Sequence, residues 1–146
     1  MRRVMMPAFL LLALSACQSG GADGTLPGNR DDTQPFGEIA MDDTVHFSGT
    51  EPFWGGEVTG EQLIYKTPDD QDGQTVTVSR FAGRAGLSYS GTLEGAAFTM
   101  AITTGKCSDG MSDRIYPYVV TLQLADAMRS GCAWSDKHPF EGPQTP

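Results

Sequence analysis

The sequence predicts a small all-β domain, an antiparallel barrel or sandwich of about eight short strands that is stapled by one disulfide. Three observations favour this class. Apolar and polar residues alternate with a period of two, β-branched residues recur at the apolar positions, and turn-forming clusters interrupt the chain about every 8 to 12 residues. No segment shows a sustained helical period, and closure of such a sheet removes its exposed edges.

The strand-like segments follow one another in a regular way. The segment 45–49 leads into the sharp sequence EPFW, and 56–67 contains two strand-like pieces around a Thr-Gly turn. After the acidic turn PDDQDG at 68–73, the segment 74–81 places Val76 and Val78 on one face and Thr75 and Thr77 on the other. The remaining segments are 87–93, 96–104, 118–124 and 131–134.

Alternation within these segments predicts which side chains form the core. The candidates are Val45, Phe47, Phe53, Trp54, Val58, Leu63, Tyr65, Val76, Val78, Leu87, Tyr89, Phe98, Ile102, Val119, Leu122 and Leu124.

The first residues have the layout of a secretory signal peptide. Arg2 and Arg3 precede an apolar run at 9–14 that is too short to span a bilayer, and small residues follow. The sequence LSAC resembles the lipobox of bacterial lipoproteins. This resemblance implies cleavage before Cys17 and attachment of palmitate-like acyl chains to it, so that the protein is anchored in a membrane. The next residue is Gln18 and not the Asp that often retains lipoproteins in the inner membrane, which favours the outer membrane, facing the periplasm. The alternative is an ordinary signal peptide followed by an incidental cysteine.

Composition divides the rest of the chain. After the predicted signal peptide (1–16), residues 17–42 are rich in Gly, Asp and Pro and are predicted to be a lipid anchor and flexible tether. The β-domain is expected at 43–135, and 136–146 is expected to be a loose C-terminal tail.

Charge argues against a nucleic-acid partner. The chain carries 18 acidic and 10 basic residues, a formal net charge of −8, and its Lys and Arg residues are scattered. A surface that follows a phosphate backbone needs clustered basic residues. An acidic surface could attract a basic partner, or it could serve solubility alone.

Cys107 and Cys132 form an even pair once Cys17 is assigned to lipid. In an oxidising envelope compartment such a pair most often forms a disulfide. The alternative is a metal or redox pair, but the sequence has no CxxC motif, and His46 and His138 lack the usual spacing for a zinc site. We therefore expect a Cys107–Cys132 disulfide and no metal or cofactor.

Two stretches, GTEPFWGG from 49 and CSDGMSDRIYPY from 107, together with the closing GCA, resemble a family of short bacterial envelope lipoproteins that has no agreed activity. The shared motifs are G-x-E-P-F-W, C-x-D-G-M-S-D-x-x-Y-P and G-C-A. In layout the chain is also similar to META-type domains and to the membrane-bound inhibitors of c-type lysozyme. The second likeness implies an architecture, which does not fix a function.

The stretch 107–118 has two interpretations. Its Asp, Ser and Gly residues can order a tight turn, which makes it a structural corner. Alternatively it recognises a ligand or partner, with Arg114 placed to hold a carboxylate. The candidate binding residues are Asp109, Met111, Asp113, Arg114, Tyr116, Glu51 and Trp54.

No serine of the stretch has a convincing base, so we expect no catalysis. The sequence predicts a non-enzymatic, lipid-anchored binding or envelope-maintenance module with an envelope protein or the cell wall as its partner. One alternative is lysozyme inhibition, in which Arg114 or Lys106 would enter the enzyme's cleft. Another is a binder of a small periplasmic ligand, such as a cell-wall fragment, at the barrel mouth.

Overall fold

The computed structural model describes residues 34–143 and contains eight strands. The predicted signal peptide, the predicted lipidation site at Cys17 and the first part of the predicted tether lie outside the described residues. The strands are β1 (Thr44–Thr50), β2 (Phe53–Thr59), β3 (Gln62–Thr67), β4 (Asp70–Ala82), β5 (Gly86–Leu93), β6 (Ala96–Cys107), β7 (Tyr116–Leu124) and β8 (Ala127–Ser135). Between residues 34 and 143 there is no helix long and apolar enough to cross a membrane.

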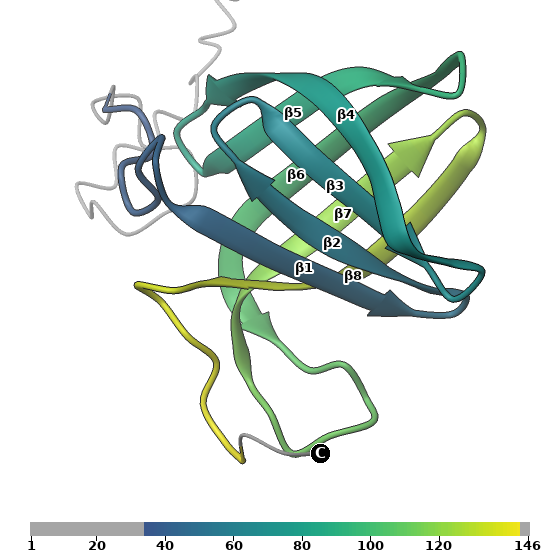
Figure 1. Ribbon diagram of the computed structural model, residues 1–146. Coiled ribbons are helices and arrows are strands. Elements are labelled where there is room, and N and C mark those ends of the chain that lie inside the picture. Colours follow the sequence, from purple (N-terminus) through teal and green to yellow (C-terminus); the bar gives the residue numbers. More distant parts are fainter. Residues whose placement is uncertain (1–33, 144–146) are drawn as a thin grey trace, which may run out of the picture. The chain divides into compact units, whose positions relative to one another are not determined.

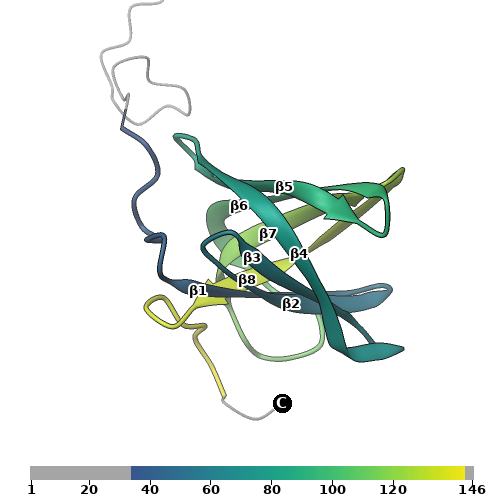
Figure 2. The ribbon, with the colours of Figure 1, turned by 45° about the horizontal axis from the view of Figure 1, so that its top comes forward.

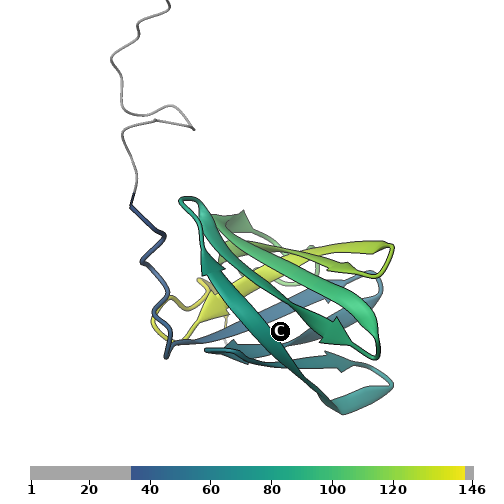
Figure 3. The ribbon, with the colours of Figure 1, turned by 90° about the horizontal axis from the view of Figure 1, so that it is seen from above.

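The strands form a closed antiparallel barrel (Figures 1, 2 and 3). Each strand pairs with the next in sequence, and β8 returns to pair with β1, from Val45 opposite Ser135 to Ser48 opposite Cys132. The disulfide joins Cys107 at the end of β6 to Cys132 in β8, with Cα atoms 5.5 Å apart. The predicted all-β fold and the predicted disulfide are confirmed, and the architecture is a barrel.

The barrel interior is filled with side chains. Period-two alternation places every second residue of each strand inside, and most predicted core residues are buried. The prediction that Phe53 is a core residue is wrong, because its neighbour Trp54 takes the inward position and leaves Phe53 54% exposed. The prediction for Val119 is also wrong, because Tyr118, Val120 and Leu122 face inward on β7 and Val119 therefore lies on the other face. The predicted core residue Leu124 is partly buried against the core.

The two ends of the barrel differ. The turns β1–β2, β3–β4, β5–β6 and β7–β8 surround one end, on the right in Figure 1, which we call the open end. The turns β2–β3 and β4–β5 lie at the other end, which we call the closed end, whereas the long β6–β7 connection extends below the barrel in Figure 1 and borders Gly49 and Thr50 of β1. The chain that precedes β1 runs along the closed end (Figures 1 and 2).

Residues 36–43, which we call the N-terminal plug, cover the closed end. The Ile39 side chain is 1% exposed and belongs to the core. The Phe36 N–H donates to the Gly83 carbonyl (2.7 Å), and Arg80 donates from Nη2 to the Ile39 carbonyl (2.7 Å). The packed chain therefore begins before the predicted boundary at 43. Composition concealed this because residues 17–42 taken together are rich in Gly, Asp and Pro, which outweighs the few apolar residues around Ile39.

The chain after β8 is also packed, although the sequence predicted a loose tail. Ser135 and His138 exchange two backbone hydrogen bonds (3.0 and 3.1 Å), and Glu141 forms an isolated bridge with Ile115. Lys137 forms an ion pair with Asp43 of the plug (Nζ–Oδ1 2.5 Å), and the Lys137 hydrogen bond is the main cause that lowers the pKa of Asp43. The segment 136–143 is thereby held by contacts that are distant in sequence, which local composition does not report.

Candidate functional site

The stretch 107–118 is organised around the carboxylate of Asp109. Its Oδ1 accepts the backbone N–H groups of Met111 (2.9 Å) and Ser112 (2.8 Å). Its Oδ2 accepts the Ser112 hydroxyl (2.8 Å) and the Tyr116 hydroxyl (3.1 Å). Partial burial would raise the pKa of Asp109, but these four hydrogen bonds outweigh it and lower the pKa to about 2. Asp109 is thus engaged within its own loop.

Arg114 is engaged as well. Its Nε donates to the Pro143 carbonyl (2.8 Å), and its guanidinium carbon lies 4.4 Å from the centre of the Phe140 ring. The neighbouring Asp113 is exposed, and Met111 is 68% exposed at the loop surface. The loop therefore presents Met111 and Asp113 outward while it uses Asp109, Arg114 and Tyr116 for internal contacts.

An aromatic cluster lies beneath this loop, outside the main core. Tyr116 is buried and contacts Trp134 (ring centres 5.2 Å apart) and Phe140 (5.5 Å). Trp134 also stacks on His46 of β1 at 5.4 Å. These contacts connect the loop, the C-terminal segment and the β1–β8 pairing into one structural unit.

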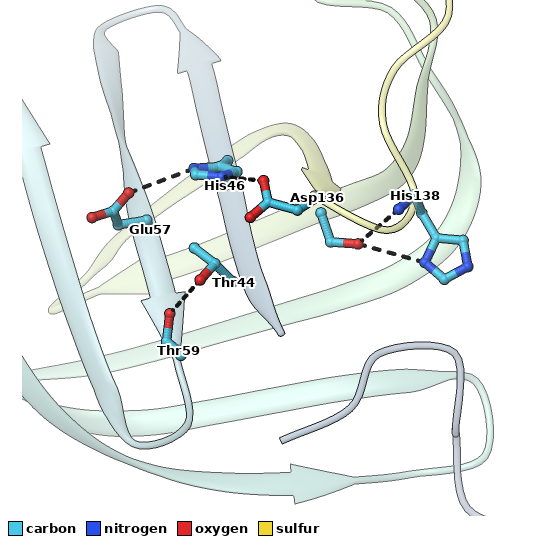
Figure 4. Close-up of polar contacts among 7 residues, drawn as sticks. Thr44, His46, Glu57, Thr59, Asp136 and His138 are labelled. Atoms are coloured by element: carbon cyan, nitrogen blue, oxygen red, sulfur yellow. Dashed lines mark hydrogen bonds and ion pairs between the residues drawn. The ribbon is translucent and has the colours of Figure 1, made fainter. Parts of the chain in front are cut away.

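His46 is held between two carboxylates on the outer face of the barrel (Figure 4). Its Nδ1 lies 3.6 Å from Glu57 on β2, and its Nε2 lies 3.2 Å from Asp136, which follows β8. Within residues 34–143, no group of three or more His, Cys, Asp or Glu side chains is placed to hold a metal ion. The arrangement therefore braces the strands that close the barrel.

The other predicted site residues lie at the β1–β2 turn. Glu51 is exposed and is joined to Pro52 by a cis peptide bond. Trp54 is 4% exposed and contacts Phe47 and Tyr65, so it belongs to the core. Phe53 and Trp54 both line an outer pocket of about 300 Å³ together with Lys66 and Gln71. The structure therefore brings Asp109, Arg114 and Tyr116 together but leaves Glu51 and Trp54 in separate surroundings.

A groove of about 190 Å³ runs beside the disulfide. It is lined by small residues of β1 and β8, among them Gly49, Thr50, Ser130 and Gly131, and by Asp109 at its edge. Its only charged side chain is that of Asp109, whose oxygens already accept four hydrogen bonds. The groove has the character of a packing seam.

A pocket of about 240 Å³ at the open end has a different character. It is lined by Tyr65, Thr67, Asp70, Gln74, Leu93, Glu94, Leu124 and Arg129. Arg129 shares the inward face of β8 with Ala133, and its Nη1 donates to the Tyr65 hydroxyl (2.5 Å). Burial raises the pKa of Tyr65, and the charge of Arg129 partly offsets the rise. The pocket, which we call the mouth, thus combines a cation, two carboxylates and two leucines.

Arg129 was not among the predicted site residues, because the last strand was expected to begin at residue 131. The structure begins β8 at Ala127, four residues earlier. The alternation that places Ala133 inside the barrel also places Arg129 inside, and this was the available signal.

The comparisons with known proteins add no assignment. A scan against protein families, a search of curated proteins and a search of solved structures each found no match to this chain. We select the mouth as the candidate site because its guanidinium group has no carboxylate partner among residues 34–143 and is suited to bind a carboxylate.

Proposed function

We propose that this protein is a lipid-anchored module of the bacterial cell envelope that binds a small ligand at the mouth of its barrel and carries out no catalysis. The observation that supports the proposal most directly is the state of Arg129. Its only protein partner among the described residues is the neutral Tyr65 hydroxyl. An arginine that faces a pocket without a carboxylate partner has donors to offer a ligand.

The polar side chains of the stretch 107–118 hold the loop together, which supports a binding site elsewhere. Asp109 and Arg114 make their contacts within the loop and with the C-terminal segment. This also weakens the case for lysozyme inhibition through Arg114, since its guanidinium lies against Phe140. These internal contacts favour a binding site elsewhere on the barrel, and the mouth is the site that we propose.

The ligand proposal is tested by a thermal-shift screen on the full-length protein in detergent. The panel would hold small acids, amines, sugars and cell-wall fragments at millimolar concentration. A ligand that binds the native state alone raises the melting temperature. We expect hits that stabilise the wild type and lose their effect in Arg129→Gln. A matched control is Lys106→Gln, which removes an exposed positive charge away from the mouth. A panel without any Arg129-dependent hit would count against the proposal.

The anchor is tested separately. Cells that produce the full-length protein would be labelled with an alkynyl fatty acid and fractionated. We expect label on the wild type and membrane association, and neither in Cys17→Ala. Soluble, unlabelled wild-type protein would show that the leader is an ordinary signal peptide.

A further inference from the structure

We infer that the mouth accepts a free apolar amino acid, a molecule with one carboxylate, one ammonium group and a short hydrocarbon side chain. This inference rests on the proposed function and specifies its ligand. It starts from a correspondence between the two ends of the barrel. Each end has one inward-facing arginine beside a tyrosine: Arg80 with Tyr89 at the closed end and Arg129 with Tyr65 at the open end.

The closed end shows what such an arginine binds in this protein. Arg80 shares the inward face of β4 with Val76 and Val78, and its Nη2 donates to the Ile39 carbonyl oxygen (2.7 Å). The side chain of the same residue, Ile39, enters the core and is 1% exposed. One residue therefore supplies both an acceptor oxygen for the guanidinium and an apolar group for the barrel interior.

The open end has the same kinds of receiving groups, and no residue of 34–143 fills it as Ile39 fills the closed end. Arg129 offers its remaining N–H groups, since its only partner in the described chain is Tyr65. Leu93 and Leu124 line the same pocket and can contact a hydrocarbon group. A ligand that filled this end as Ile39 fills the other would present an oxygen acceptor to Arg129 and an aliphatic group to the leucines. A carboxylate is the acceptor that a guanidinium prefers.

The ammonium group follows from the charges on the pocket wall. Asp70 and Glu94 both line the mouth, so its side chains carry two negative charges against the single positive charge of Arg129. The Oδ1 atom of Asp70 accepts the Gly73 N–H (3.0 Å), and the Oε1 atom of Glu94 accepts the Gln74 side-chain amide (3.0 Å). The second oxygen of each carboxylate has no partner among residues 34–143. A ligand amine would engage these oxygens and offset the repulsion that a simple carboxylate meets.

The volume agrees with this class of ligand. A pocket of about 240 Å³ holds about eight groups of the size of a water molecule, at roughly 30 Å³ each. That is the size of valine or leucine. A cell-wall disaccharide or a long-chain fatty acid would extend well outside the pocket.

The test compares leucine with two analogues that each lack one charge. Isothermal titration of the full-length protein in detergent would be run with leucine, with 4-methylpentanoate, which lacks the amine, and with isoamylamine, which lacks the carboxylate. We expect leucine to bind at least about tenfold more tightly than either analogue. Equal or tighter binding of an analogue, or no binding of leucine, would overturn the inference.

Two variants and one control separate the roles of the guanidinium group and the carboxylate. Arg129→Gln should abolish leucine binding, whereas the control Lys106→Gln should leave it unchanged. Glu94→Gln, on an exposed rim residue, should weaken leucine but not 4-methylpentanoate, because only leucine carries the amine. Leucine binding that survives Arg129→Gln would refute the assignment to the mouth. If the screen yields Arg129-dependent hits of another class while leucine fails, this inference fails and the proposed function stands. If nothing binds in an Arg129-dependent way, both fail.

Discussion

Replacement of Asp109 by alanine tests whether the stretch 107–118 is a structural corner. The change removes a carboxylate that accepts two backbone N–H groups and two hydroxyls, those of Ser112 and Tyr116. Tyr116 is buried in the aromatic cluster with Trp134 and Phe140, so loss of its hydrogen bond should also loosen that packing.

The pKa of Asp109 bounds the magnitude. A pKa shift from 3.8 to about 2 would contribute about 2.4 kcal/mol to the free energy of unfolding if the carboxylate were fully shielded from solvent. Because the carboxylate lies near the surface, solvent screening reduces this to about 1 kcal/mol. The alanine variant additionally leaves its hydrogen-bonding partners to water, so we expect a total loss of about 2 kcal/mol. For a domain of this size the melting temperature should fall by about 6 to 10 °C.

The assay is thermal unfolding followed by circular dichroism, with Asp113→Ala as the control. Asp113 is an exposed carboxylate of the same loop, and its removal should cost less than about 0.5 kcal/mol. Because the folded pKa of Asp109 is depressed, its stabilisation is complete above about pH 4 and is lost as the pH falls through about 2. The gap between wild type and Asp109→Ala should therefore narrow between pH 4 and pH 2. Equal melting temperatures of the two proteins at pH 7 would refute this account of the loop.

Three further predictions concern the barrel. Gly131→Ala should destabilise the protein by about 1 to 3 kcal/mol or prevent folding, because the new Cβ would lie 2.1 Å from the Ser48 carbonyl oxygen. The control Gly105→Ala, whose Cβ would lie 3.4 Å from its nearest neighbour, should be tolerated, and urea unfolding compares the two variants. Ile39→Ala should cost about 2 to 4 kcal/mol and the exposed Met41→Ala little, and similar urea midpoints for the two would contradict the role of the plug. Cys107→Ser should lower stability by about 3 kcal/mol, since the disulfide closes a loop with a sequence separation of 25, and a reductant should destabilise the wild type but not this variant.

The sequence predicted an all-β barrel or sandwich because alternation is a local signal. Val76 and Val78, or Leu87 and Tyr89, show by their spacing alone that they share a face, and the structure buries all four. The errors occurred where two adjacent apolar residues compete for the inward position, as Phe53 does with Trp54. Spacing within such a pair cannot decide between them; the register with neighbouring strands does.

The candidate site was less predictable, because its contacts join distant parts of the chain. The hydrogen bond from Tyr116 to Asp109 is nearly local, and the sequence motif suggested an ordered turn. The contact of Arg114 with Phe140, and that of Arg129 with Tyr65, depend on how strands and terminal segments meet in space. Neither pairing could be predicted from the local spacing of residues, and both became visible only in the structure.

The N-terminal plug determines how the domain would bear mechanical load. A pull on the chain that enters at residue 34 reaches the plug before it reaches β1. Resistance in the plug comes from the Phe36–Gly83 hydrogen bond, from Ile39 packed in the core and from the hydrogen bond of Arg80 to the Ile39 carbonyl. Tension on the chain at residue 34 would therefore uncap the closed end while β1 still pairs along both of its edges, so that the plug yields before the barrel opens.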